Sequence, residues 1–123
     1  MASPLPQLSG GTFLCDGGLE TTLMFHQGVD LPHFAAFVLL DDEPGRERLK
    51  NYSASYLALC AETPGAGYLL DTPTWRANPD WAALLGLDAE RLRAVNTLAA
   101  RTACALRDAW APRLSGPIVV SGV

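Results

Sequence analysis

The chain has 123 residues, of which 49% are hydrophobic and 18% are charged. This balance is typical of a single folded domain with a buried core, and it excludes an intrinsically disordered chain. The net charge is −4 and the nine basic residues are scattered, so a basic nucleic-acid binder is excluded. Because no apolar run could span a membrane and residues 1–6 show no secretory signal, we expect a cytoplasmic protein.

Three short apolar runs are each bounded by glycine, proline or aspartate. They cover residues 12–15, 67–70 and 117–120. Each run is nearly continuously apolar rather than alternating, which is typical of strands that are buried on both faces of a parallel sheet. The sequence therefore predicts three parallel strands.

Helical patterns separate these runs. The acidic residues before Pro44 predict a helix start, and the pair Pro64-Gly65 predicts its end. The apolar face of this helix is expected to contain Leu49, Tyr52, Tyr56 and Leu59. A shorter helical segment over residues 19–27 follows the first strand, with Gly28 at its end.

Two more helices are predicted between the second and third strands. Asn78 with Pro79 opens a short one, Gly86 interrupts it, and Asp88 caps a longer one that ends at Pro112. The longer helix is expected to bury a stripe formed by Leu92, Val95, Ala99, Ala103, Leu106 and Trp110.

This alternation of strands and helices predicts an α/β fold, either doubly wound or a barrel. The last strand runs to within a few residues of Val123, and three strands leave both edges of their sheet bare. We therefore expect an N-terminal extension over residues 1–9, followed over residues 10–123 by the first part of a larger domain.

Candidate functional groups follow each predicted strand, where parallel α/β folds gather their reactive residues. Asp16, followed by Gly17 and Gly18, could bind an ammonium group or act as a base, or it could simply cap the next helix. Thr72 and Thr74 could contact a ligand or only form a turn.

Other residues near the second strand end leave similar alternatives. Trp75 and Trp81 could line a pocket or simply pack, and Arg76 could bind a carboxylate or be a solvated loop charge. The three cysteines, Cys15, Cys60 and Cys104, are widely spaced and are expected to be reduced and mostly buried. His26 and His33 have no third ligand nearby, so no metal site is predicted within the chain.

Four segments in order resemble the homocysteine S-methyltransferase family. Residues 16–23 resemble the end of that family's first strand and the helix that follows it, and residues 28–31 resemble its G-x-[DN]-L turn. Residues 65–77 look like its second strand with the T-x-T-aromatic segment, and residues 117–123 look like its third strand. The resemblance covers residues 10–123.

The resemblance implies the N-terminal part, about three βα units, of a zinc-dependent (β/α)8 barrel. Such enzymes transfer a methyl group from a donor to the thiol of homocysteine, giving methionine, and zinc converts that thiol into a thiolate. By motif matching, Asp16 holds the amino group of homocysteine, Gly17 and Gly18 form a backbone wall, and Thr72 and Thr74 line the same pocket.

The chain also departs from the family. The zinc cysteines of the family lie late in the barrel and have no counterpart here, so zinc ligands are expected downstream and the isolated chain is expected to be inactive. Two alternatives remain: a non-catalytic barrel remnant that acts through a partner or an oligomer, and a metal-free barrel enzyme that uses Asp16.

Overall fold

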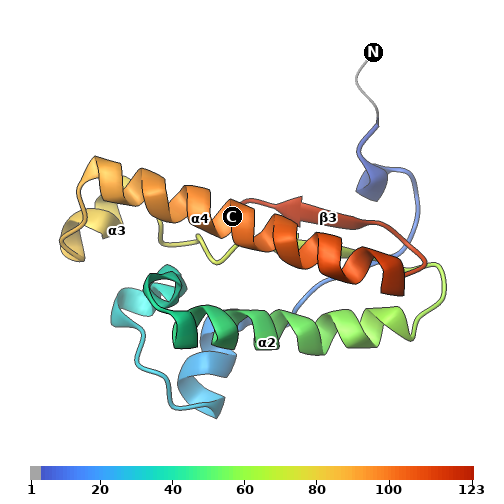
Figure 1. Ribbon diagram of the computed structural model, residues 1–123, viewed down its shortest axis with the longest axis horizontal. Helices are drawn as coiled ribbons and strands as arrows, with labels where there is room; N and C mark the ends of the chain where they lie inside the picture. Colours follow the sequence, from blue (N-terminus) through green and yellow to red (C-terminus); the bar gives the residue numbers. More distant parts are fainter. Residues whose placement is uncertain (1–3) are drawn as a thin grey trace.

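Two long helices lie beside one small parallel sheet in a computed structural model, which describes residues 4–123 (Figure 1). The strands occur in the order β1-β2-β3, and both pairings are parallel. The expected α/β class is confirmed, with strand bounds shifted by at most one residue. The strands are β1 (Phe13–Leu14), β2 (Gly67–Asp71) and β3 (Ile118–Ser121), and the long helices are α2 (Glu43–Ala61) and α4 (Ala89–Trp110).

Short helical elements connect these parts. The segment predicted over residues 19–27 forms α1 (Leu19–Thr21), which continues as the π-helical η2 (Thr22–His26), and α3 is Pro79–Leu84. Four 3-10 turns were not expected, because such turns lack the 3.6-residue period of an α-helix. They are η1 (Pro6–Leu8), η3 (Pro32–Phe34), η4 (Ala36–Asp41) and η5 (Ala111–Arg113). Of the expected extension, residues 1–3 lie outside the described residues.

The predicted helix starts are confirmed by their capping hydrogen bonds. The side chain of Asp42 accepts a hydrogen bond from the amide of Gly45 at 2.7 Å, and that of Asp88 accepts one from the amide of Arg91 at 2.8 Å. The Asn78 side chain caps α3 in the same way. Each bond satisfies one of the amides that a helix leaves without a partner in its first turn.

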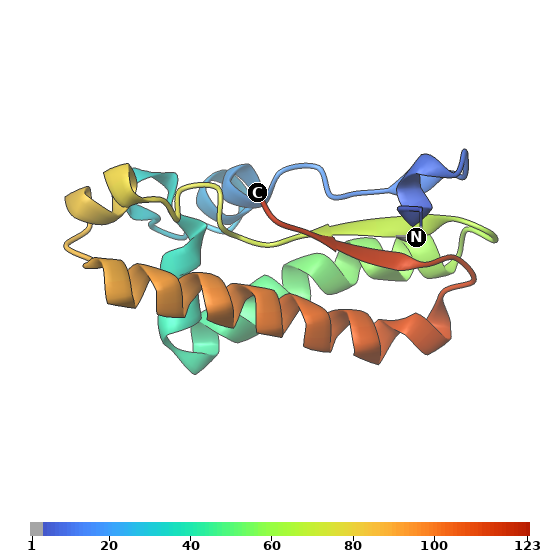
Figure 2. The ribbon, with the colours of Figure 1, turned by 90° about the horizontal axis from the view of Figure 1, so that it is seen from above.

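Both long helices cover the same face of the sheet. Tyr68 and Leu70, two residues apart on β2, belong to one apolar cluster with Leu57 and Cys60 of α2 and with Ala103 and Leu106 of α4. Figure 2 shows α2 and α4 together on one side of the strands. Because side chains alternate along a strand, Leu69 faces the opposite side, which neither helix covers.

The predicted stripes of both long helices are confirmed only in part. In α4, Ala99, Ala103 and Leu106 are buried, whereas Leu92, Val95 and Trp110 are half-buried. In α2, one of the predicted positions is wrong. Leu59 is 60% exposed, and Leu57 and Cys60 are buried instead. Successive residues of an α-helix are 100° apart, so positions 59 and 60 both continue the pattern set by Tyr56. The Cys60 thiol donates to the carbonyl of Gly67 at 3.4 Å, so contact with the sheet decides which of the two positions is buried.

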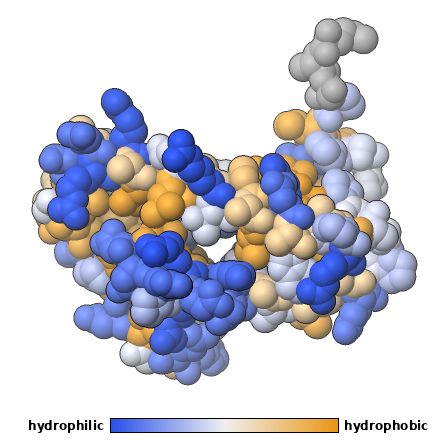
Figure 3. All heavy atoms as spheres, viewed as in Figure 1, coloured by the Kyte–Doolittle hydropathy of each residue, from blue (hydrophilic) through white to orange (hydrophobic). Residues whose placement is uncertain are grey.

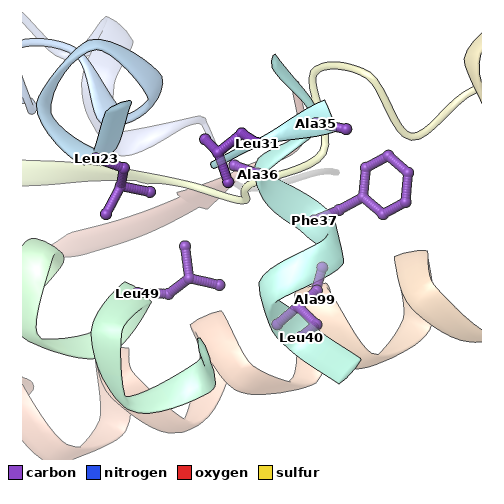
Figure 4. Close-up of a cluster of buried hydrophobic side chains, with 8 residues drawn as sticks. All are labelled: Leu23, Leu31, Ala35, Ala36, Phe37, Leu40, Leu49 and Ala99. Carbon is purple, nitrogen blue, oxygen red and sulfur yellow. The ribbon is translucent and has the colours of Figure 1, made fainter. Parts of the chain in front are cut away.

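A second apolar cluster holds the first turns of α2 beside the carboxyl ends of the strands. It joins Leu23 of η2, Phe37 and Leu40 of η4, Leu49 of α2 and Ala99 of α4, and none of these is more than 8% exposed (Figure 4). Burial of these side chains stabilises the arrangement by about 1.5–3 kcal/mol for each large residue. The cluster thereby fixes the position of Tyr52, one turn further along α2.

Helices α2 and α4 run side by side in the same direction, opposite to β3 (Figure 1).

Within residues 4–123, no helix has the combination of length and apolar composition that crossing a membrane requires.

Candidate functional site

A cavity of about 270 Å³ lies where the carboxyl ends of the three strands meet. Residues that follow each strand contribute to it, and the N-terminal half of α2 closes one side. Its lining includes Asp16, Gly17, Gly18 and Glu20 after β1, Asp71, Thr72, Pro73 and Trp75 at and after the end of β2, Val123 after β3, and Leu49, Tyr52 and Ser53 from α2. The structure therefore brings four of the five expected site residues, all except Thr74, to one cavity.

The carboxylate of Asp16 is held by a tyrosine from α2. The hydroxyl of Tyr52 donates to Oδ2 of Asp16 at 2.6 Å and accepts a hydrogen bond from the amide of Gly18 at 3.1 Å. Helix α1 begins after Gly18 with no side-chain cap. The interpretation of Asp16 as a helix cap is therefore wrong, because its bonded carboxylate oxygen reaches across to α2.

Tyr52 is the site residue that sequence reasoning missed. The sequence predicts that Tyr52 lies on the apolar face of the helix, and the residue is indeed only 7% exposed. Burial and the hydrogen bond to Asp16 raise the pKa of Tyr52, so the hydroxyl stays protonated and remains a donor. The available signal was a tyrosine at a buried position, because a buried phenol oxygen needs a polar partner.

Gly17 and Gly18 each occupy a position that disfavours a side chain. A Cβ at Gly17 would lie 3.0 Å from the hydroxyl oxygen of Tyr56. Gly18 has φ 155° and ψ 97°, a backbone conformation that residues with a Cβ rarely adopt. The two glycines therefore let the chain turn from β1 into α1 while the backbone stays at the cavity wall.

Thr72 and Thr74 differ in their position relative to the cavity. Both are 7% exposed, and their hydroxyl oxygens lie 2.7 Å apart. The hydroxyl of Thr74 donates to the carbonyl of Val123 at 3.2 Å, which ties the turn after β2 to the end of β3. Thr72 lines the cavity, whereas Thr74 supports it from behind as the turn interpretation predicts.

The cavity is strongly acidic. Asp16, Glu20 and Asp71 line it, and no lysine or arginine is among its lining residues in the part of the chain that the structure describes. Partial burial and the charge of Asp16 both raise the pKa of Asp71. A cation bound in the cavity would therefore stabilise these carboxylates, and the arrangement favours a ligand with an ammonium group.

A second cavity, of about 250 Å³, differs in chemistry. It lies between α2 and α4, and its lining is largely aliphatic, with Leu40, Ala99 and Leu106 among its residues. Figure 3 shows this face hollowed between the two helices, with hydrophobic residues on part of the rim and hydrophilic residues on the rest. Among the residues that the structure describes, only two charged side chains line it, Lys50 and Asp71, so the acidic cavity is the better candidate for recognition of a polar substrate.

Arg76 is not a freely solvated charge. Its guanidinium carbon lies 3.9 Å from the ring centroid of Trp75 and 3.9 Å from that of Trp81. Trp75 is 48% exposed and lines the acidic cavity. The tryptophans therefore hold the arginine by cation–π contacts directly beside the cavity.

The residues present do not fit a zinc ion. Across residues 4–123, no three histidine, cysteine, aspartate or glutamate side chains are grouped closely enough to hold a metal. The three cysteines are free thiols: Cys15 is exposed, which contradicts the expectation that they are mostly buried, Cys104 is half-buried, and Cys60 is buried. Burial raises the pKa of the Cys60 thiol, which disfavours the thiolate that zinc requires.

Comparison of the chain with protein-family models, with curated proteins and with solved structures found no match.

Proposed function

We propose that the acidic cavity binds the amino-acid end of homocysteine, and that the chain forms part of a homocysteine S-methyltransferase. The reaction moves a methyl group from a small-molecule donor to the homocysteine sulfur and yields methionine. The observation that carries the proposal is the carboxylate of Asp16, held by Tyr52 at 2.6 Å in a cavity at the carboxyl ends of three parallel strands.

The charge of the cavity supports an ammonium ligand. Asp16 accepts only one hydrogen bond, from Tyr52, within residues 4–123, and an ionised carboxylate has room for about four. The α-ammonium group of an amino acid supplies three donors and a positive charge. Charge-assisted bonds of this kind contribute about 1.5–3 kcal/mol each.

The fold supports a barrel as the setting of the site. The strands neighbour one another in chain order, and both crossover helices lie on one face of the sheet. Consecutive units of a (β/α)8 barrel have this arrangement, with helices outside and the active site at the carboxyl ends of the strands. We therefore propose that residues 10–123 form the amino-terminal units of such a barrel.

In this proposal, the residues of the acidic cavity do not activate the thiol of homocysteine. Zinc, when bound in the family that the sequence resembles, converts the substrate thiol into a thiolate, but no residue group described above fits zinc. The proposed work of this chain is to bind and orient: Asp16 holds the ammonium group, Gly17 and Gly18 keep the backbone close to the substrate, and Thr72 offers a hydroxyl at the wall.

Binding of L-homocysteine to the chain, measured by isothermal titration calorimetry, tests the proposal. Asp16→Asn should weaken binding by about tenfold to a hundredfold, because a charge-assisted hydrogen bond is lost. The matched control is Asp30→Asn, since Asp30 is an exposed carboxylate outside the cavity lining. Absence of binding to the wild-type chain, or equal affinity in Asp16→Asn, would overturn the proposal.

A further inference from the structure

The aliphatic cavity between α2 and α4 adjoins the acidic cavity at the end of β2. Five residues line both cavities: Leu49 and Ser53 of α2, Leu70 and Asp71 of β2, and Pro73 in the turn that follows. The two volumes, about 270 and 250 Å³, are each smaller than the roughly 300–1,000 Å³ of typical ligand pockets. Side by side, the cavities offer one ligand an acidic surface and an aliphatic surface.

The aliphatic cavity exists because α4 presents small side chains at this level of the sheet. Ala99 and Ala103, one turn apart on α4, line it, and Leu40 of η4 and Leu49 of α2 also contribute. An alanine side chain is a single methyl group, so it leaves space between the two helices, and this face is hollowed there (Figure 3). Such a surface favours the aliphatic part of a ligand, because removal of that part from water is favourable.

Asp71 supplies a negative charge at the boundary between the two cavities. Its carboxylate forms no ion pair within residues 4–123, and partial burial and the charge of Asp16 raise its pKa. A carboxylate in this position is stabilised when a cation binds beside it. The boundary therefore favours the positively charged end of a ligand whose remainder is aliphatic.

Lys50 does not neutralise this charge. It is the other charged residue that lines the aliphatic cavity in the described part of the chain. Its ammonium group lies 4.0 Å from the carboxylate of Glu47 on the same helix, and its side chain is 58% exposed. Because Glu47 and solvent offset the charge of Lys50, an anionic ligand gains less there than a cationic ligand gains at Asp71.

We propose that the end of β2 carries a second binding site, which takes a small primary amine with an unbranched aliphatic chain. The ammonium group binds the carboxylate of Asp71, and the chain lies in the aliphatic cavity against Ala99 and Ala103. This site differs from the one assigned to homocysteine, whose ammonium group binds Asp16. The inference therefore goes beyond the proposed function.

Three ligands separate the contributions of charge and chain. They are hexylamine, ethylamine, which has a shorter chain, and hexanoate, which has the opposite charge. Each is titrated at pH 7 into the full 123-residue chain, labelled with ¹⁵N, and the dissociation constant is taken from amide shifts in NMR spectra. Hexylamine should bind and shift the amides of Ala99 and Ala103.

The other two ligands should bind more weakly. Ethylamine should bind at least a hundredfold more weakly, because each of the four missing methylene groups contributes roughly fourfold. Hexanoate should bind roughly tenfold more weakly than hexylamine, because it cannot pair with Asp71. Hexanoate binding as tight as that of hexylamine would overturn the role of Asp71.

Substitutions test each part of the site with a matched control. Asp71→Asn should weaken hexylamine binding roughly tenfold, whereas Asp30→Asn, at an exposed carboxylate outside both linings, should not change it. Ala103→Leu fills the aliphatic cavity and should weaken hexylamine binding at least tenfold. Ala100→Leu is its control, because Ala100 is exposed on the same helix and does not line the cavity.

Circular dichroism verifies that each variant is folded. If Ala103→Leu does not fold, Ala105→Leu replaces it, since Ala105 lines the same cavity from an exposed position. Either folded variant should leave the affinity for L-homocysteine unchanged, because neither alanine lines the acidic cavity.

The possible outcomes distinguish this inference from the proposed function. If hexylamine does not bind the wild-type chain, or binds Asp71→Asn and the cavity-filling variant as tightly as the wild type, the second site is overturned and the homocysteine assignment is unaffected. If hexylamine binds as expected while L-homocysteine does not bind, the second site stands and the homocysteine assignment fails.

Discussion

At the amino ends of the strands, a Cβ on Gly116 would collide with the carbonyl group of Ala66, whereas at the carboxyl ends a Cβ on Gly122 would meet nothing within 4 Å. The amino ends are also tied together by a hydrogen bond from the amide of Gly65 to the Ser115 hydroxyl at 2.6 Å. The carboxyl ends instead enclose an acidic cavity. Close packing at one end of the sheet thus supports an open, polar arrangement at the other.

The difference has a physical basis in what each end contains. Buried thiol, glycine and backbone groups at the amino ends satisfy one another, as the contact of Cys60 with the carbonyl of Gly67 shows. At the carboxyl ends, acidic side chains lie close together, and partial burial and the charge of Asp16 raise the pKa of Asp71. We therefore expect substitutions to change stability most at the amino ends and ligand binding most at the carboxyl ends.

The largest expected effect is that of Gly116→Ala. The new methyl group would meet backbone atoms of Ala66 and Gly67, which cannot move without shifting β2. We expect the free energy of unfolding, measured by urea denaturation, to fall by about 3 kcal/mol. Gly122→Ala serves as control and should change it by less than about 0.5 kcal/mol. Equal effects of the two substitutions would contradict the contrast between the ends.

Tyr52→Phe should have an intermediate effect. Within residues 4–123 it removes the only side-chain hydrogen bonds that join α2 to Asp16 and Gly18, so the free energy of unfolding should fall by about 1–2 kcal/mol. Tyr56→Phe is the matched control one turn further along α2. Calorimetric titration should also show weaker L-homocysteine binding in Tyr52→Phe only. A loss of stability without a loss of binding would show that Tyr52 does not position Asp16.

The smallest expected effect is that of Asp71→Asn, and it depends on pH. Because the folded chain raises the pKa of Asp71, the folded state binds its proton more tightly than the unfolded state does. The ionised carboxylate therefore destabilises the fold at neutral pH, and this cost disappears below the ordinary pKa of 3.8. Asp71→Asn should raise the free energy of unfolding at pH 7, by less than about 1 kcal/mol because Asp71 is largely solvated.

Thermal unfolding of both proteins from pH 3 to pH 7 measures this difference. The two unfolding temperatures should coincide at pH 3 and separate as the pH rises through and above the ordinary carboxyl range. A stabilisation that is the same at pH 3 and pH 7 would mean that the charge of Asp71 is not its cause.

Local signals in the sequence were sufficient for much of the fold. The helix starts at Asp42, Asn78 and Asp88 follow from capping chemistry that involves residues only three positions apart. The apolar runs that become β2 and β3 are short, continuous and bounded by turn residues. The placement of Asp16 and Thr72 at one edge follows from the parallel arrangement, since all strands of such a sheet end on the same side.

Tertiary contacts decided what those signals left open. Sequence periodicity allowed either Leu59 or Cys60 to be buried, and the fit of the smaller residue against Gly67 selected Cys60. Asp16 had two local interpretations, and the hydroxyl of Tyr52, 36 positions away, selected between them. Arg76 acquired its environment from Trp81, which α3 brings back onto the turn after β2.

The sequence alone thus determined which segments are strands and helices, because capping, turns and apolar periodicity act between near neighbours in the chain. Only the tertiary structure decided which polar groups meet. A hydrogen bond or a cation–π contact forms only when the interacting atoms are placed to within a few tenths of an ångström to about one ångström. The packing of α2, α3 and the sheet against one another sets those atomic positions.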